Sequence, residues 1–171
     1  MTDHGAMQRR DDPERSDVAE TTLDQGGAVG PALRDAGAVL ARTEADELAA
    51  AAARLRFEAE GLPILAPGTT LAAELRRDEV LHAERSSAML NRMDGAATLP
   101  GYAGTLYLTS QRLIHIGHVT FSVSLAQIEQ LSIAGERLLL TLSGGEGVSL
   151  DVSEPRVLRV LIGIARKTAI R

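Results

Sequence analysis

The chain has 171 residues, of which 44% are hydrophobic, 24% are charged and none is cysteine, and its net charge is −5. This length and composition suit one soluble globular domain with additional segments. The lack of cysteine excludes disulfides, thiolate metal ligands and thiol nucleophiles, and it is compatible with a reducing compartment. The N-terminal residues contain no apolar signal-peptide core, and no run of about 18 apolar residues occurs. We therefore expect a cytoplasmic protein.

The negative charge lies in the first part of the chain. Residues 1–71 contain seven basic and thirteen acidic residues, whereas residues 72–171 contain eleven basic and ten acidic residues. A nucleic-acid-binding surface needs clustered basic residues, and single-strand binders add aromatic side chains for stacking. Only two Tyr and two Phe occur here. We therefore expect no nucleic acid among the partners.

The first 62 residues fall into two parts by composition. Residues 1–30 are polar and acidic, and such a segment cannot offset its own ordering entropy, so a disordered acidic tail is expected. Residues 31–62 are rich in Ala, Leu and Glu, and they predict a helix over residues 44–60 with Thr43 as its N-cap and Gly61 at its end.

One face of this expected helix carries a narrow apolar stripe. Leu33 and Leu40 repeat its spacing toward the N-terminus, which leaves open a longer helix or a helical hairpin from Pro31. The stripe can pack on the protein's own domain, or it can associate with a second copy. Residues 63–71 contain two prolines and a glycine and are expected to be a linker. The stripe consists of Leu48, Ala52, Leu55 and Ala59.

From about Asp78 the hydrophobic pattern alternates, which predicts β-strands. Short polar or glycine-containing segments separate most of the runs, and "SGGEG" is typical of a hairpin turn because glycine adopts positive φ easily. Residues 93–101, "MDGAATLPG", are expected to form a longer loop. Seven antiparallel strands are thus expected, at residues 79–90, 105–109, 112–116, 119–125, 128–133, 137–143 and 147–152.

The last 19 residues, "SEPRVLRVLIGIARKTAIR", predict a C-terminal helix. Ser153 is expected to be its N-cap, and Pro155 suits the first turn, where its missing donor does no harm. Basic residues near the end complement the helix dipole. The apolar positions form a wide face, so we expect this helix to close one end of a β structure.

Three stretches carry a family resemblance: "GTLYLTSQRLIHI" at residues 104–116, "FSVSLAQIEQLSI" at residues 121–133 and "RLLLTLSGGEGVSLDV" at residues 137–152. With seven antiparallel strands followed by one helix, they resemble the GRAM and bacterial pleckstrin-homology-like (PH-like) families over about residues 72–171. The resemblance implies a mainly β fold with α additions. It is a seven-stranded antiparallel β-sandwich or barrel capped by a C-terminal helix, here preceded by the N-terminal Ala-rich helix.

The resemblance also places particular side chains. Leu106 and Leu108 are expected to face the core, with Tyr107 on the other side of the sheet. Leu125 and Ile128 are expected to form a one-turn corner whose apolar side chains lie under the barrel. PH domains that bind phosphoinositides carry a basic cluster on the first hairpin, where this chain has only Arg85 and Arg92. Together with Arg112 they are the candidate residues for an anionic head group.

No motif for catalysis or metal binding stands out. His115 and His118 are spaced H-x-x-H without a neighbouring carboxylate, and zinc needs three or four ligands, so surface histidines at a hairpin edge are expected. The "SGGEG" segment precedes a strand and therefore lacks the helix N-terminus that holds phosphate. No nucleophile has a base beside it in sequence. We therefore expect no catalytic residue, no metal, no cofactor and no enzymatic activity.

These observations lead to three functional hypotheses. The first is a non-enzymatic binding module that mediates protein–protein interaction or self-association in the cytoplasm. The second is a peripheral protein at the inner membrane face, which binds anionic head groups through Arg85, Arg92 and Arg112. The third is a carrier of a small apolar ligand, because a barrel with few large aromatic residues can leave a cavity.

Overall fold

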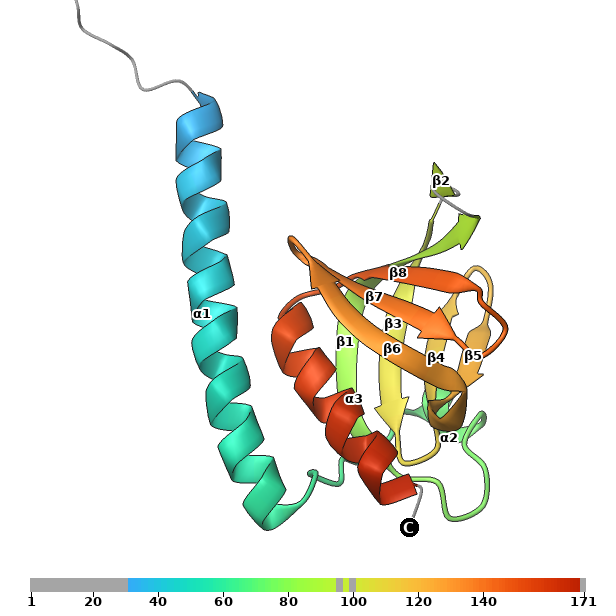
Figure 1. Cartoon of the computed structure of the whole chain (residues 1–171). Helices are drawn as coiled ribbons and strands as arrows, with labels where there is room; N and C mark the ends of the chain where they lie inside the picture. The colour runs from blue at the N-terminus through green and yellow to red at the C-terminus, as the bar shows by residue number, and fades with distance from the viewer. Residues whose placement is uncertain (1–30, 95–96, 99–100, 170–171) are drawn as a thin grey trace, which may run out of the picture.

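The computed structural model describes residues 31–94, 97–98 and 101–169, so the expected tail lies outside the described residues. A strongly bent antiparallel sheet forms the body of the protein, α3 covers one open end of it, and the long α1 stands beside α3 (Figure 1). The helices are α1 (Pro31–Glu60), α2 (Thr69–Ala72) and α3 (Pro155–Ala169), with a 3-10 turn η1 (Leu125–Gln127). The strands are β1 (Leu81–Asp94), β2 (Ala97–Thr98), β3 (Tyr102–Thr109), β4 (Arg112–Gly117), β5 (Phe121–Ser124), β6 (Ile128–Ala134), β7 (Arg137–Leu142) and β8 (Gly147–Asp151).

The strands follow the order β5-β4-β3-β1-β8-β7-β6, and the short β2 pairs with β1. All neighbours are antiparallel, as expected for strands joined by short turns. The central β1 changes register against β3 between Arg85 and Ala88, where Ser87 has a φ of 57°. Such bulges bend a strand. The expected mainly β fold, with seven antiparallel strands closed by a C-terminal helix, is confirmed by this topology.

The sheet encloses the main apolar core. Leu106 and Leu108 lie in it at 2% and 1% exposure, as expected, and Tyr107 faces the other side of the sheet. The α3 helix adds its own apolar face to this core: Leu158, Leu161, Ile162 and Ala165. Burial of this face holds α3 over the sheet.

A second, smaller apolar cluster lies on the opposite face of the β1–β3–β4 region. Its buried members are Leu71, Leu81 and Ile114, with Tyr107 packed against them. Leu71 comes from α2, and its exposure is 0%. The segment between α1 and β1, part of which was expected to be a linker, therefore packs on the sheet.

Several expected boundaries differ from the observed ones. The first strand continues to Asp94, beyond the expected end at Leu90, and β2 occupies part of the expected loop. The corner after β5 is confirmed, because Leu125 and Ile128 are both fully buried. A capping box holds the corner: the side chain of Gln127 accepts from the backbone N–H of Ser124 at 3.1 Å.

The N-terminal helix is longer than residues 44–60. It begins at Pro31, so Thr43 lies in its interior and the N-cap prediction is wrong. The end at Gly61 is confirmed, since this residue has a φ of 81° and its N–H donates to the carbonyl of Phe57 at 3.0 Å. The Ala-rich sequence from Pro31 sustains one continuous helix despite Gly37.

Candidate interaction site

One carboxylate fixes α1 against α3. Asp46, in the middle of α1, accepts the backbone N–H of Arg156 at 2.9 Å and that of Val157 at 3.2 Å. The first N–H groups of a helix have no partner within the helix, and Pro155 has no N–H. The N–H groups of Arg156 and Val157 are therefore the donors of the first turn of α3 that need a cap. Asp46 is only 7% exposed. The cap expected from Ser153 is therefore wrong: the capping side chain comes from α1.

Further contacts support this docking. The guanidinium of Arg156 lies 3.6 Å from the Asp46 carboxylate and 3.3 Å from that of Glu47. Near the middle of α1, Arg42 pairs with Glu136 at 3.1 Å. Phe57, one turn before the end of α1, packs against the main core. The side of α1 that includes Asp46 and Phe57 is therefore the side that docks.

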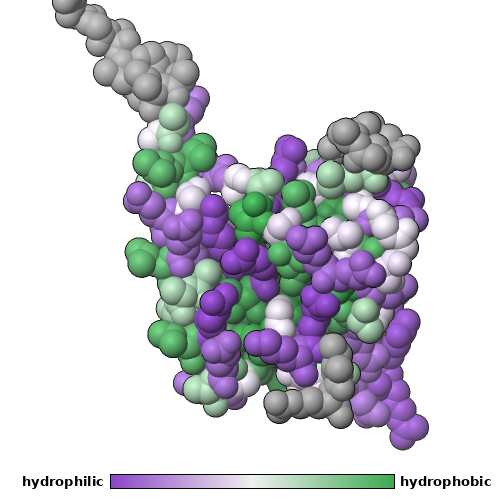
Figure 2. Space-filling model, viewed as in Figure 1, coloured by the Kyte–Doolittle hydropathy of each residue, from purple (hydrophilic) through white to green (hydrophobic). Residues whose placement is uncertain are grey.

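The predicted apolar stripe lies on the other side of α1. Leu48 and Leu55 are 75% and 76% exposed, and Ala52 and Ala59 are also exposed. Hydrophobic side chains project from the side of α1 that faces away from the sheet (Figure 2). We call Leu48, Ala52, Leu55 and Ala59 the outer stripe. α1 does pack on its own domain, but the outer stripe takes no part in that packing.

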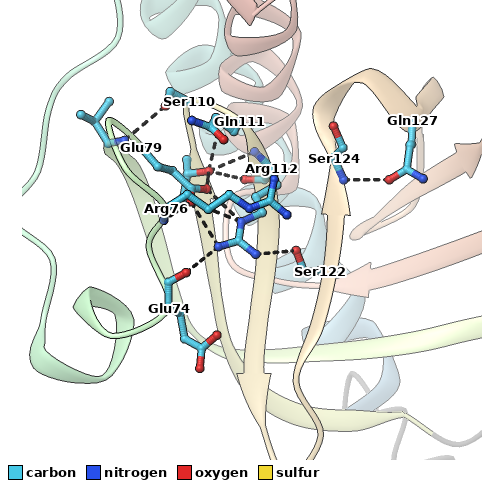
Figure 3. A network of polar contacts seen from close by, with 11 residues as sticks. Glu74, Arg76, Glu79, Ser110, Gln111, Arg112, Ser122, Ser124 and Gln127 are labelled. Atoms are coloured by element: carbon cyan, nitrogen blue, oxygen red, sulfur yellow. Dashed lines mark hydrogen bonds and ion pairs between the residues drawn. The ribbon is translucent and has the colours of Figure 1, made fainter.

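A buried polar network surrounds Arg112 at the β3–β4 turn (Figure 3). Its Nε donates to Glu79 Oε1 at 3.0 Å, and its Nη2 donates to Glu79 Oε2 at 3.1 Å and to the carbonyl of Glu74 at 2.6 Å. Thr109 adds a hydroxyl donor to Glu79 Oε1 at 2.6 Å. The side chains of Arg112 and Glu79 are 11% and 0% exposed. Arg112 thus ties the segment before β1 to the sheet.

The same network sets the protonation of Glu79. Burial alone raises the pKa of this carboxyl, but the hydrogen bonds from Arg112, Thr109 and the backbone of Arg76 outweigh burial, so the pKa is lower than usual. Glu79 therefore remains a carboxylate, paired with the Arg112 guanidinium.

The other two candidate arginines have carboxylate partners of their own. Arg85 Nη2 lies 3.2 Å from Glu154 just before α3, and the Arg85 side chain is 17% exposed. Arg92 lies 3.6 Å from Glu146 in the β7–β8 turn, and its side chain is 57% exposed. The structure places Arg85, Arg92 and Arg112 against glutamates from three separate segments, and it does not gather them into one cluster. Their role in head-group binding stays a prediction.

His115 is buried, so the expectation that it is a surface residue is wrong. It is 1% exposed, and its Nε2 lies 3.4 Å from the carbonyl of Ala88. The ring occupies space beside Gly104 on the neighbouring strand, where a Cβ would come within 2.7 Å of it. His118 is exposed, as expected.

Within the described residues, no group of three or more His, Asp or Glu side chains is arranged to hold a metal ion. No helix in that part of the chain combines the length and apolar character needed to cross a bilayer.

No protein-family model and no curated protein sequence matches this chain. Among solved structures, it is similar to the C-terminal domain of an unknown protein from Leishmania infantum, with a TM-score of 0.39 and 13% identity over 60% of this chain and 90% of that chain. It is also similar to the pleckstrin homology domain of USP37, with a TM-score of 0.38 and 14% identity over 48% of this chain and 98% of that chain. The resemblance to GRAM domains stays a prediction.

Sequence reasoning missed the roles of Asp46 and Glu79, the buried carboxylates among the described residues. Asp46 is acidic and lies on the same helix face as Ala50, Ala53 and Phe57, which is the signal that could have marked it. Glu79 has no comparable signal, because its partner Arg112 is 33 residues away in sequence.

Proposed function

We propose that this chain is a non-enzymatic binding module that associates with a second copy of itself through the outer stripe of α1. The observation that carries the proposal is the exposure of Leu48 and Leu55 on a helix whose opposite side is already docked. A leucine pair so exposed on an ordered helix is typical of an interaction surface.

The outer stripe follows a heptad repeat. With Leu48 and Leu55 at d positions, every a position from Ala45 to Ala59 is alanine. Alternating small and large side chains allow two helices to approach closely with knobs-into-holes packing. The docked side, with Asp46 and Phe57, falls at the b and f positions, so the a/d seam remains accessible in the folded protein.

Charges beside the seam favour a parallel arrangement of two copies. One flank, the e positions, carries Arg42 and Arg56, which pair within the chain with Glu136 and Glu60, and the other flank, the g positions, carries Glu44 and Glu58. In a parallel pair of helices the e flank of one chain faces the g flank of the other, whereas an antiparallel pair brings like flanks together. The antiparallel arrangement therefore brings like charges together, and the parallel arrangement does not. We expect a parallel dimer.

The expected affinity follows from the exposed leucines. Full burial of a leucine side chain is worth about 1.5–3 kcal/mol. Leu48 and Leu55 are each about three-quarters exposed, so the four leucines of a dimer contribute about 5–9 kcal/mol. Lost translational and rotational freedom offsets part of this gain. The dissociation constant of the dimer should therefore be micromolar or weaker.

Sedimentation velocity of the full chain over a range of concentrations tests the proposal. The wild-type chain should shift toward a dimer as concentration rises, and the Leu48→Glu/Leu55→Glu variant should stay a monomer. Leu40→Glu is the matched control, because Leu40 is 60% exposed on the same helix but lies at a c position outside the seam. A wild-type chain that remains a monomer, or equal association of all three proteins, would refute the proposal.

A further inference from the structure

A polar groove lies between α1, α3 and the edge strand β6. It consists of two adjoining hollows of about 500 and 430 Å³, which share Arg54, Arg159 and Val160 as lining residues. Leu131 and Ile133 of β6 line its other side. Figure 2 shows hydrophilic side chains gathered between α1 and the body of the protein. We call this feature the α1–α3 groove.

Positive charge dominates the lining of the groove. Arg54 extends from α1, and Arg159 and Lys167 extend from α3. Within the described residues none of these three makes an ion pair, whereas the groove's Arg156 is paired with Asp46 and Glu47. The acidic residues of the described lining are Glu47 and Glu58. A protein of net charge −5 thus presents several uncompensated cations in one concave place, which favours an anionic occupant.

The N-terminal sequence of the chain has complementary charge. Residues 11–20, "DDPERSDVAE", contain five acidic residues and one arginine. The tether is long enough: from Pro31 to Arg54 the helix rises about 35 Å, a distance that about eleven extended residues can span. Residues before about Glu20 can therefore reach Arg54, and earlier residues can reach farther along α3.

We infer that the α1–α3 groove binds the acidic segment at residues 11–20 of the same chain. The acidic side chains meet Arg54, Arg159 and Lys167, and Val18 and Ala19 lie against the apolar side chains of the groove. Covalent attachment raises the local concentration of the segment to about the millimolar range, so weak individual ion pairs suffice. None of the four outer-stripe residues lines this groove, although Glu58 beside the seam does.

Paramagnetic relaxation in the full chain tests the inference. The chain has no cysteine, so Ser16→Cys carries a spin label at one known site. The label should broaden the NMR signals of amides around the groove, at residues 131–133 and 159–167. The broadening should fade as salt rises from about 0.01 M to about 1 M, over which the Debye length falls from about 30 Å to about 3 Å.

Charge reversal in the groove provides the decisive comparison. Arg159→Glu should remove the broadening, and Lys167→Glu, at an exposed position near the end of α3, should weaken it without disturbing the fold. Arg77→Glu is the matched control, because this arginine is 97% exposed and lies outside the groove, and it should change nothing. Broadening that is absent, spread evenly over the surface or insensitive to Arg159→Glu and Lys167→Glu overturns the inference. So does equal broadening of an unlabelled ¹⁵N chain mixed with the spin-labelled one.

Discussion

Replacing Asp46 by alanine should detach α1 from α3. The Asp46 carboxylate accepts two backbone N–H groups of α3 at 2.9 and 3.2 Å and lies 3.6 Å from the Arg156 guanidinium. Loss of an N-cap side chain costs about 0.5–2 kcal/mol, and hydrogen bonds to a charged acceptor are worth about 1.5–3 kcal/mol each. Because water can replace the lost acceptor once α1 detaches, we expect Asp46→Ala to lower the free energy of unfolding by about 2–3 kcal/mol, between the value for one cap and the sum for two charged hydrogen bonds.

Asp46→Asn removes the charge and one of the two acceptors. The carbonyl oxygen of asparagine can accept one backbone N–H, but its Nδ2 is a donor and cannot accept the other, and no charge remains to pair with Arg156. We therefore expect Asp46→Asn to be less destabilising than Asp46→Ala and to cost about 1–2 kcal/mol relative to the wild type. A change at Glu47 is the control, because the Glu47 side chain is 60% exposed and pairs with Arg156 without accepting a backbone N–H of α3 among the described residues. Glu47→Ala should cost less than about 1 kcal/mol.

Urea denaturation measures these differences, and hydrogen exchange locates them. In Asp46→Ala the amides of α1 and of the first turn of α3 should exchange faster, while those of the central strands should follow global stability. An unchanged urea midpoint together with unchanged protection of α1 would refute the reasoning, since it would mean that the docking does not depend on this carboxylate.

Three further predictions concern the body of the fold. Arg112→Ala should destabilise by about 3–5 kcal/mol in urea denaturation, because it leaves the buried Glu79 carboxylate without its guanidinium, whereas Arg92→Ala should cost less than about 1 kcal/mol. Because the pKa of Glu79 is lower in the folded chain, its ionised form stabilises the fold at pH values above the pKa of the unfolded chain. This stabilisation is lost as the pH falls through the lower pKa of the folded chain. Glu79→Gln should therefore flatten the acid limb of a pH–stability curve, and an unchanged slope would contradict the assigned pKa direction. Gly104→Ala should destabilise by at least about 1 kcal/mol, because its Cβ would collide with the carbonyl of Ile116; a melting temperature equal to the wild type would contradict this.

Local sequence patterns predicted the elements that depend on residues close together in the sequence. The β3–β4 hairpin, the corner at Leu125 and Ile128, and the end of α1 at Gly61 each depend on residues a few positions apart. Alternating hydrophobicity, a capping box and a helix-terminating glycine with positive φ can be recognised over such short separations in sequence. The outer stripe was also identified from its spacing, because helical periodicity marks a face.

The failures involve partners far apart in the chain. Ser153 satisfied the local rule for an N-cap, yet Asp46, 110 residues before Arg156, fills that role. Glu154 has a φ of 53° at the start of α3. No local sequence pattern shows that α1 packs against the first turn of α3.

His115 shows a different limit. Alternation along β4 places it on the same face as the buried Leu113, but its polarity favoured exposure. The deciding factor is Gly104 on the neighbouring strand, whose missing Cβ leaves room for the ring. Which side of α1 docks was equally hidden, because the docked side contains Asp46 and small alanines, whereas the exposed side contains the leucines.

Disulfide formation at one position of the seam tests the central claim most directly. A single Ala52→Cys variant of this cysteine-free chain places the two thiols opposite each other at an a position of a parallel dimer. We expect rapid oxidation to a covalent dimer, seen on a non-reducing gel, with little cross-linking of the control Leu40→Cys at a c position. Equal or slower cross-linking of Ala52→Cys would contradict a parallel dimer through the outer stripe.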